Sequence, residues 1–289
     1  MDNYNHNANN NNDNDNNGYF RPVRMIGDDK NNGDPRNETI YQFIKFTCCP
    51  HFTFLSVVFC LSAVDLIIYV VTLCFGLEMD PTQLLAPKYS TLDKFGMKIN
   101  YKIHNGQVWR WITFGLLHAN LVHIVVNLCS QLIIGSFIEN AIGHVKAGLL
   151  YLGSSIGGGV FSSLVSDSSG VGASVAIFGM LSAYFGYMIL NWYYIDEMEG
   201  PRNKYCNLLF IAFIVIMNVG YGFSNDRIDN YGHIGGLIFG FFLSLVLIKP
   251  FNVNDGLCCK TKTWFIIGAI TAGVLFVAFV LMFYLLKKY

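Results

Sequence analysis

Residues 231–248 read YGHIGGLIFGFFLSLVLI, and a single histidine is the only ionisable group other than tyrosine in this stretch. Its length is close to the ~20 apolar residues that a helix needs to cross ~30 Å of hydrocarbon. Small residues recur at every fourth position, at Gly232, Gly236, Gly240 and Ser244. Residues four apart share a helix face, and small side chains there let two backbones approach closely. The stretch therefore predicts a transmembrane helix packed tightly on a neighbour.

The whole chain shares this apolar character. Of its 289 residues, 53% are hydrophobic and 13% are charged, whereas charged residues make up about a quarter of a soluble chain. The 19 basic and 19 acidic residues cancel, so nothing favours a nucleic-acid partner. Cysteines stand next to each other at two places, Cys48-Cys49 and Cys258-Cys259, and no CxxC spacing occurs. This pattern argues against a disulfide framework and against a zinc site. We expect a protein of the lipid bilayer.

Seven apolar stretches follow a polar tail. The tail, residues 1–40, has asparagine at ten of its first seventeen positions and is expected to be a disordered cytoplasmic segment. The apolar stretches run over 52–77, 115–138, 145–165, 173–192, 206–222, 231–248 and 264–286. Backbone polar groups in lipid must be satisfied internally, so the stretches are expected to be helices. We predict an all-α membrane protein with a six-helix core over 41–250 and a loop plus a seventh transmembrane helix over 251–289.

Two further expectations concern the arrangement of these helices. The third stretch is rich in glycine and serine, so it is expected to be enclosed by its neighbours. With a cytoplasmic N-terminus, eleven Lys and Arg residues lie on the cytoplasmic side and three on the other, once the long first loop is set aside. Because cytoplasmic loops are enriched in these residues, the count favours a cytoplasmic N-terminus and a lumenal or extracellular C-terminus.

The first loop, residues 78–114, is long and amphipathic. Trp109, Arg110 and Trp111 lie there among apolar residues such as Ile103 and Ile112. A solvated extracellular loop is the simpler interpretation. Tryptophan and arginine together favour the depth of the lipid headgroups, so we expect the segment to lie in the membrane interface.

Polar residues mark the beginnings of three helices. In a serpentine bundle the second, fourth and sixth helices begin on the same side, here the non-cytoplasmic one. These beginnings contain His118, His123 and Asn127, then Gly172 and Ser174, then His233. A lone intramembrane histidine usually makes an interhelical hydrogen bond, but three in one layer with a serine favour a functional site. His118 is expected in the turn before its helix, because it does not share the face of His123 and Asn127.

The fourth helix has a small-residue ridge of its own at Gly179, Ala183 and Gly186. Ordinary bundle packing would explain either ridge alone. Together the two ridges are expected to bring the fourth and sixth helices close enough for His233 to reach Ser174.

A serine in contact with a histidine is the minimum for nucleophilic acyl transfer. The imidazole takes the hydroxyl proton and later returns it to the leaving amine. The nearest acids, Asp167, Asp226 and Asp229, fall in loops, so a two-residue unit fits and replacing these acids by asparagine is expected to cost little. No metal or organic cofactor is needed for this chemistry.

An oxyanion would also have to be held. The backbone N–H of Ser174 at a helix start and the side chains of His123 and Asn127 are candidate donors. Gly172 fits a turn whose backbone approaches a substrate.

These residues form motifs that resemble the rhomboid intramembrane serine proteases, from the first helix to the sixth. Trp109-Arg110 resembles the Trp-Arg pair of the family's first loop. The run His118-Ala-Asn-Leu-Val-His123-Ile-Val-Val-Asn127 resembles its second-helix motif, and Gly135, Glu139 and Gly143 form its G-x-x-x-E-x-x-x-G motif. Gly172-Ala173-Ser174 resembles the nucleophile motif G-x-S-G, and His233, Gly236 and Gly240 resemble the sixth-helix motif.

The resemblance implies a role for each residue. Ser174 looks like the nucleophile and His233 like the general base and acid. Oxyanion stabilisation and substrate positioning are implied for His123, Asn127, Gly172 and His118, and supporting roles for Phe178, Trp109, Arg110 and Glu139, with Phe178 packed on the base. Val175 stands where the motif has its last glycine and Gly232 where it has alanine, and we expect Val175 to narrow the space beside the nucleophile.

The resemblance also implies a substrate class and a location. Six core helices plus a seventh are similar to the eukaryotic secretory-pathway branch, which implies a multi-pass protein of the secretory pathway or plasma membrane that cleaves single-span transmembrane proteins through an acyl-enzyme. The tail resembles those of malaria-parasite members, which implies surface adhesins among the substrates. The expected partners are these substrates and the lipid bilayer.

Two other functions were weighed against the protease. An inactive relative that binds transmembrane helices in trafficking is one alternative, but such relatives lack the serine or the histidine. A transporter would require broken helices with charges at the midplane. Glu139 lies near the cytoplasmic end instead, where a structural cap of the adjoining loop explains it better.

Overall fold

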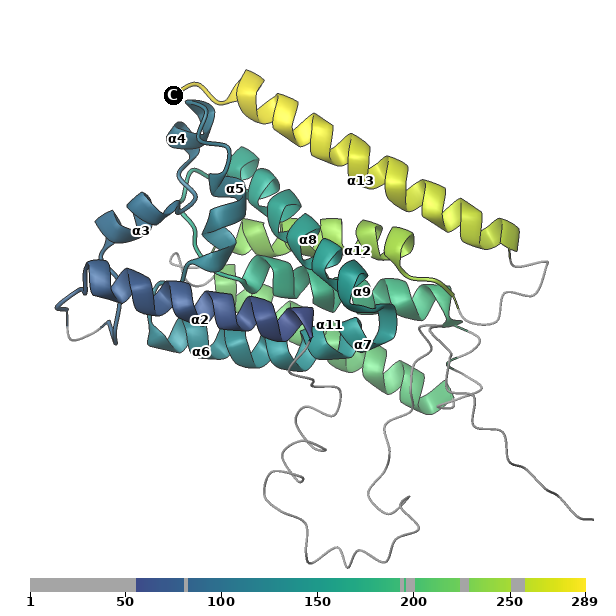
Figure 1. Ribbon diagram of the computed structural model, residues 1–289. Helices are drawn as coiled ribbons and strands as arrows, with labels where there is room; N and C mark the ends of the chain where they lie inside the picture. The colour runs from purple at the N-terminus through teal and green to yellow at the C-terminus, as the bar shows by residue number, and fades with distance from the viewer. Residues whose placement is uncertain (1–55, 81–82, 193–194, 196–200, 224–228, 251–257) are drawn as a thin grey trace, which may run out of the picture.

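The computed structural model describes residues 56–80, 83–192, 195, 201–223, 229–250 and 258–289. The predicted tail over 1–40 and the loop over 251–257 lie outside the described residues. The helices in chain order are α2 (Val57–Phe75), α3 (Tyr89–Phe95), α4 (Asn100–His104), α5 (Arg110–Thr113), α6 (Leu121–Ser130), α7 (Ser136–Ile142), α8 (His144–Val165), α9 (Ser174–Leu190), α11 (Pro201–Phe223), α12 (Asn230–Leu247) and α13 (Cys258–Leu286) (Figure 1). A 3-10 turn, η2 (Phe114–Leu116), precedes α6, and a π-helical turn, η3 (Gln131–Gly135), joins α6 to α7.

Each of the seven apolar stretches contains a helix, and the protein is an all-α membrane protein. Among the described residues, five helical segments are long and apolar enough to cross a bilayer: Val57–Phe75, Leu121–Ile142, His144–Val165, Asn230–Leu247 and Lys262–Leu286. The helix Ser174–Leu190 is apolar but shorter. The helical prediction is therefore confirmed, while the boundaries moved by several residues.

One boundary error concerns the second helix, which begins at Leu121 and not at residue 115. Asn120 adopts an extended backbone, and its side chain accepts a hydrogen bond from the His123 N–H at 2.8 Å. Asparagine is a favoured helix N-cap because its oxygen satisfies one of the four N–H groups that a helix start leaves unpaired. His118 consequently lies before the helix, as its position on the helical wheel predicted.

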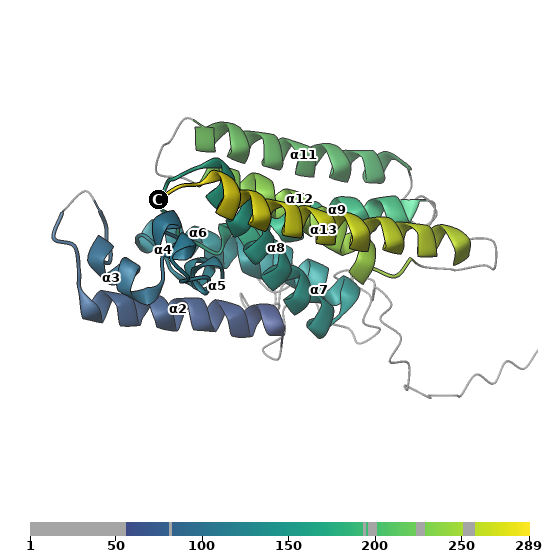
Figure 2. The same ribbon diagram turned by 90° about the horizontal axis from the view of Figure 1, so that it is seen from above.

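α12 lies at the centre of the bundle. It packs against α9, α8 and α13, whereas α11 contacts α9 and α12 much less closely. Figure 2 shows α2 and α11 on opposite sides, with α8, α9 and α12 between them. The beginnings of α6, α9 and α12 consequently lie close to one another at one end of the bundle.

Glycine allows the closest of these contacts. A Cβ on Gly240 of α12 would lie 2.2 Å from the backbone oxygen of Gly179, and one on Gly236 would lie 2.2 Å from the backbone oxygen of Val175. A Cβ on Gly186 would collide with the hydroxyl of Ser244. The two small-residue ridges therefore face each other, and their helices pack backbone against backbone.

Gly240→Ala is expected to lower the free energy of unfolding by about 3 kcal/mol, because the added methyl meets backbone atoms that cannot rotate away. Gly273→Ala in α13 is the control, since a Cβ there meets nothing within 4 Å. That control should be neutral or slightly stabilising, because alanine has the higher helix propensity. Reversible unfolding in mixed detergent micelles measures both. Equal unfolding midpoints for Gly240→Ala and wild type would contradict the close approach of α9 and α12.

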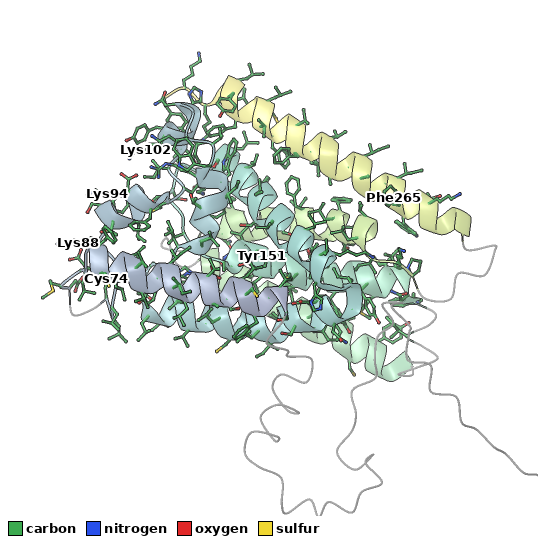
Figure 3. The ribbon with its side chains drawn as sticks, viewed as in Figure 1. Cys74, Lys88, Lys94, Lys102, Tyr151 and Phe265 are labelled. Atoms are coloured by element: carbon green, nitrogen blue, oxygen red, sulfur yellow. The ribbon has the colours of Figure 1, made fainter. Side chains whose placement is uncertain are left out.

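α8 is the most enclosed of the five candidate spans. In the apolar 18-residue part of α8, 56% of the residues are buried inside the bundle, against 11% in the corresponding part of α13. Tyr151 of α8 lies inside the bundle, whereas Phe265 projects from α13 (Figure 3). The prediction that the glycine- and serine-rich third stretch is surrounded by other helices is confirmed.

Candidate active site

Ser174 and His233 are in hydrogen-bond contact. Ser174 is the first residue of α9, and His233 lies in the first turn of α12. The Ser174 Oγ and His233 Nε2 atoms are 2.8 Å apart, although 59 residues separate them in the chain. The contact follows from the close packing of α9 on α12, which brings the two helix beginnings to the same depth.

Phe178 fixes the plane of the His233 imidazole. The two rings stack with centroids 4.3 Å apart and an interplanar angle of 9°. Phe178 is one helical turn after Ser174, so α9 supplies both the hydroxyl and the aromatic surface that flank the imidazole. The contact implied by the resemblance for Phe178 is present.

The described acids do not contact the other ring nitrogen. Within the described part of the chain, His233 Nδ1 has no hydrogen-bond partner. Asp167 binds Lys287 instead, with the Lys287 Nζ atom 2.8 Å from the Asp167 Oδ1 atom, and Asp226 lies outside the described residues. The Asp229 carboxylate faces Lys98. The described geometry is that of a serine–histidine pair.

Donors for an oxyanion surround Gly172, two residues before Ser174. Gly172 has a φ of +132°, which favours glycine, and a Cβ there would lie 2.8 Å from His123 Nε2 and 3.5 Å from Asn127 Nδ2. The Ala119 N–H donates to His123 Nδ1 at 3.4 Å, so a neutral ring carries its proton on Nε2. Asn127 Nδ2 has no hydrogen-bond partner among the described residues. Two side-chain donors thus point at the backbone beside the hydroxyl.

His118 stands behind His123. Its ring is fully buried, and the two ring centroids are 5.3 Å apart in an edge-to-face arrangement. Burial and the neighbouring His123 together lower the pKa of His118 to about 3, so His118 is neutral at physiological pH. Its contact is with His123 and supports the orientation of that ring.

The expected effect of Val175 on the space beside the nucleophile was wrong. The Val175 side chain is 2% exposed and points between helices, toward Gly158 of α8 and Gly232 and Gly236 of α12. A helix turns by about 100° per residue, so the residue after Ser174 faces a different direction. Val175 fills the junction of three helices.

Arg110 also departs from its expected place. The guanidinium is buried inside the first loop, where it donates to the Met97 carbonyl at 2.6 Å, to the Asp93 carboxylate at 3.0 Å and to Gln107 at 2.7 Å. Its donors are used within the loop, so Arg110 does not reach toward headgroups. Trp109 is half-exposed, whereas Trp111 is buried with its indole N–H donating to Ser163.

Glu139 joins α7 to the beginning of α2. Its two carboxylate oxygens accept hydrogen bonds from the backbone N–H groups of Val57 at 2.7 Å and Val58 at 2.9 Å. It also contacts His144 just after the helix, which agrees with the structural role predicted at the adjoining loop. A carboxylate at a helix N-terminus is stabilising, because it satisfies unpaired N–H groups and complements the helix dipole.

The sequence interpretation missed a buried cluster of Lys98, Ser162 and Asp229. Lys98 is fully buried, and its Nζ atom lies 2.6 Å from the Asp229 Oδ2 atom. An aspartate directly before a helix is a recognisable N-cap, so the sequence did contain a signal for Asp229. Nothing distinguished Lys98 from the other lysines of its loop. Within the residues that the structure describes, no three His, Cys, Asp or Glu side chains form a group that could hold a metal ion.

The fold and the site define a multi-pass helical membrane protein that holds a serine–histidine pair inside its bundle. A family model for the rhomboid domain matches residues 105–250. The chain belongs to the rhomboid family.

Several relatives agree with this assignment. Rhomboid-like protease 2 of Toxoplasma gondii is 30% identical over 228 residues, which cover 78% of this chain and 75% of that protein. RHOMBOID-like protein 7 of Arabidopsis thaliana is 36% identical over 208 residues, covering 68% of this chain and 64% of the relative. RHOMBOID-like protein 1 of the same plant is 37% identical over 175 residues, and the chain spans 43% of its length. The family therefore includes proteins named as proteases.

Proposed function

We propose that this protein is an intramembrane serine endopeptidase that cleaves single-span transmembrane proteins. The observation that carries the proposal is the 2.8 Å contact between Ser174 Oγ and His233 Nε2, beside the donors gathered around Gly172. Serine attack needs a base at hydrogen-bond distance and donors for the oxyanion, and both groups are present.

The geometry supports the following sequence of steps. Ser174 Oγ attacks the carbonyl carbon of the scissile peptide while His233 Nε2 takes the hydroxyl proton. The carbonyl oxygen becomes an oxyanion, which accepts hydrogen bonds from the Ser174 backbone N–H and from His123 and Asn127. The carbon–nitrogen bond then breaks as His233 returns the proton to the leaving amine, leaving an acyl-enzyme. A water molecule, deprotonated by the same imidazole, then attacks the acyl carbon. The bond from that carbon to Ser174 Oγ breaks, the imidazole returns the proton to Oγ, and the second product leaves as a carboxylic acid.

The substrate is a transmembrane helix that approaches from the side of α11, and surface adhesins are members of this class. α11 contacts α9 and α12 only sparsely, and its described side chains Leu209, Phe213 and Ile216 are exposed. A peptide bond within a helix is protected by its own hydrogen bonds, so cleavage requires small or helix-breaking residues near the scissile bond.

A serine-directed phosphonate probe tests the proposed activity, together with a reporter that carries one transmembrane helix with a glycine-rich site. The purified full chain is expected to be labelled at Ser174 and to cleave the reporter. Absence of both labelling and cleavage, in protein that is folded and reconstituted in lipid, would favour the inactive relative that binds transmembrane helices.

The orientation of the chain is a separate part of the proposal. A cytoplasmic N-terminus places the N-glycosylation sequon Asn37-Glu38-Thr39 away from the lumen, in a membrane of the secretory pathway or the cell surface. We expect no glycan at Asn37 when the protein is synthesised with glycosylation-competent microsomes. A second sequon placed after Tyr289 provides the control and should be modified. A glycan at Asn37 would invert the topology.

A further inference from the structure

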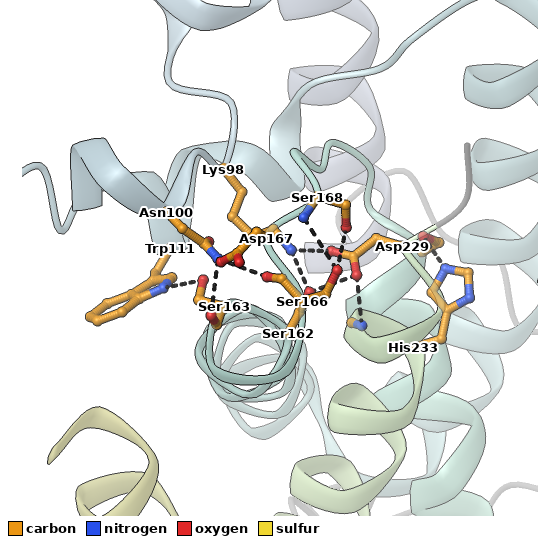
Figure 4. A network of polar contacts seen from close by, with 12 residues as sticks. Lys98, Asn100, Trp111, Ser162, Ser163, Ser166, Asp167, Ser168, Asp229 and His233 are labelled. Carbon is orange, nitrogen blue, oxygen red and sulfur yellow. Dashed lines mark hydrogen bonds and ion pairs between the residues drawn. The ribbon is translucent and has the colours of Figure 1, made fainter. Parts of the chain in front are cut away.

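The cluster of Lys98, Ser162 and Asp229 joins three segments that are far apart in the sequence. Lys98 belongs to the first loop, Ser162 to α8, and Asp229 stands directly before α12. Lys98 Nζ contacts both Asp229 Oδ2, at 2.6 Å, and the Ser162 hydroxyl, which itself donates to Asp229 Oδ1 at 2.6 Å. Figure 4 shows these side chains converging, with His233 nearby in the first turn of α12.

Asp229 determines how α12 begins. Its Oδ1 atom accepts a hydrogen bond from the Gly232 N–H at 3.0 Å, and its backbone carbonyl accepts one from the His233 N–H at 3.2 Å. The carboxylate therefore caps the turn in which His233 lies. A shift of Asp229 would move the backbone that carries the imidazole.

Lys98 holds the segment that leads to Ser174. Its backbone N–H donates to the Gly170 carbonyl at 3.0 Å, and the Gly170 N–H donates to the Lys98 carbonyl at 3.2 Å. Gly170 also packs on the ion pair itself, since a Cβ there would lie 2.8 Å from Asp229 Oδ2 and 3.2 Å from Lys98 Cε. The segment that leads to Ser174 and the helix that carries His233 therefore both contact the Lys98–Asp229 ion pair.

The partners of Asp229 keep its carboxylate ionised. Burial by itself would raise the pKa of the Asp229 carboxyl, but the Lys98 ammonium and the hydrogen bonds from Ser162 and Gly232 outweigh it and hold that pKa below its ordinary value. The carboxylate does not bind the imidazole, whose Nδ1 has no partner among the described residues. Asp229 therefore influences His233 through the position of α12, in addition to the through-space attraction between its carboxylate and a protonated imidazole.

We propose that Lys98 and Asp229 are positioning residues, which act as one unit to hold Ser174 and His233 at hydrogen-bond distance. The proposal rests on the proposed protease function and concerns the same site. It replaces the expectation that Asp229→Asn costs little, which assumed that Asp229 lay free in a loop. It also makes the first loop part of the support of the site, because Lys98 contributes both its backbone and its ammonium group.

Two conservative variants test the unit in the full chain reconstituted in lipid. Lys98→Met keeps the length of the side chain and removes the ammonium, while Asp229→Asn keeps the oxygen that caps α12 and removes the charge. Each is expected to lower kcat for the transmembrane reporter and the rate of phosphonate labelling at Ser174 by at least about tenfold, since small displacements of reacting groups have effects up to 10²-fold. KM is expected to stay within about twofold, because no substrate contact is removed.

The double variant Lys98→Met/Asp229→Asn should be no slower than the slower single variant, because groups that act as one unit are not additive. Lys102→Met is the matched control. It breaks a second Lys–Asp pair of the first loop, in which Lys102 Nζ lies 2.5 Å from Asp93 Oδ2 and which does not contact α12. Its labelling rate should stay within about twofold of wild type, as expected of a partly exposed pair.

The outcomes separate the two proposals. If the wild-type protein is neither labelled nor able to cleave the reporter, the protease function itself is wrong. If wild type is active and folded Asp229→Asn is labelled as fast as Lys102→Met, the positioning role is overturned while the protease function stands. A rise in KM at unchanged kcat would also overturn it. Rates are compared for equal amounts of protein that is monodisperse on gel filtration. If Lys98→Met does not fold, Asp229→Asn decides the question.

Discussion

Ser174→Ala, His233→Ala and the Ser174→Ala/His233→Ala double variant are expected to fall to the same background rate of peptide-bond cleavage. In the proposed mechanism the hydroxyl loses its proton to the imidazole 2.8 Å away, so removal of either group abolishes the same step. Members of a catalytic unit are strongly non-additive, and each loss should be on the order of 10⁴-fold or more. Cleavage of the transmembrane reporter in lipid, followed over hours, provides the required sensitivity.

The control for these variants is Ser168→Ala. Ser168 is an exposed serine in the segment before Ser174, where it bonds only to Ser166 among the contacts described. Its removal should leave the cleavage rate within about twofold of wild type, as is usual for surface substitutions. A His233→Ala variant that keeps substantially more activity than Ser174→Ala would show that another group takes the proton, and the two-residue unit would have to be rewritten.

Asn127→Ala and His123→Ala are expected to give the second-largest losses, about 10²- to 10³-fold each in kcat, the usual effect of removing one oxyanion donor. The reason is geometric. Both side chains lie beside Gly172, and the Asn127 amide nitrogen is buried without a hydrogen-bond partner among the described residues, so it is available to an incoming oxygen. The oxyanion exists only during reaction, so KM should change little.

Asn105→Ala is the matched control for the asparagine variant. Asn105 is exposed at the end of α4 and should be replaceable without loss of activity. The His123→Ala/Asn127→Ala variant should be slower than either single variant, in contrast to the serine and histidine pair, because two donors share one charge. Loss of less than about twofold in Asn127→Ala would show that the oxyanion is held elsewhere.

Several features of the fold followed from local sequence. The composition placed the chain in a bilayer, and each predicted apolar stretch contains a helix, because ~20 apolar residues in lipid must satisfy their own backbone polar groups. The error at the start of α6 was avoidable, since Asn120 carries the N-cap signal that sets Leu121 as the first helical residue. Helix beginnings depend on such single residues, to which hydropathy is insensitive.

The site itself was predicted in part. Residue spacing indicated that Ser174 and His233 meet, because the glycine ridges of two helices that begin on the same side leave few other arrangements. Spacing could not indicate where Val175 and Arg110 point. Val175 packs on glycines of α8 and α12, and Arg110 binds residues earlier in the first loop. These contacts exist only after the chain has folded.

The sequence by itself determined the membrane class, the positions of the helices and the serine and histidine that meet, because these depend on composition and on periodicity within single segments. Only the tertiary structure decided that Lys98 and Asp229, 131 residues apart, form a buried ion pair beneath the site. The local sequence around a loop lysine does not indicate whether its side chain is solvated or buried. Its charge acquires a partner only when distant segments bring a carboxylate within a few ångströms, since the interaction depends on distance in space and on the exclusion of water.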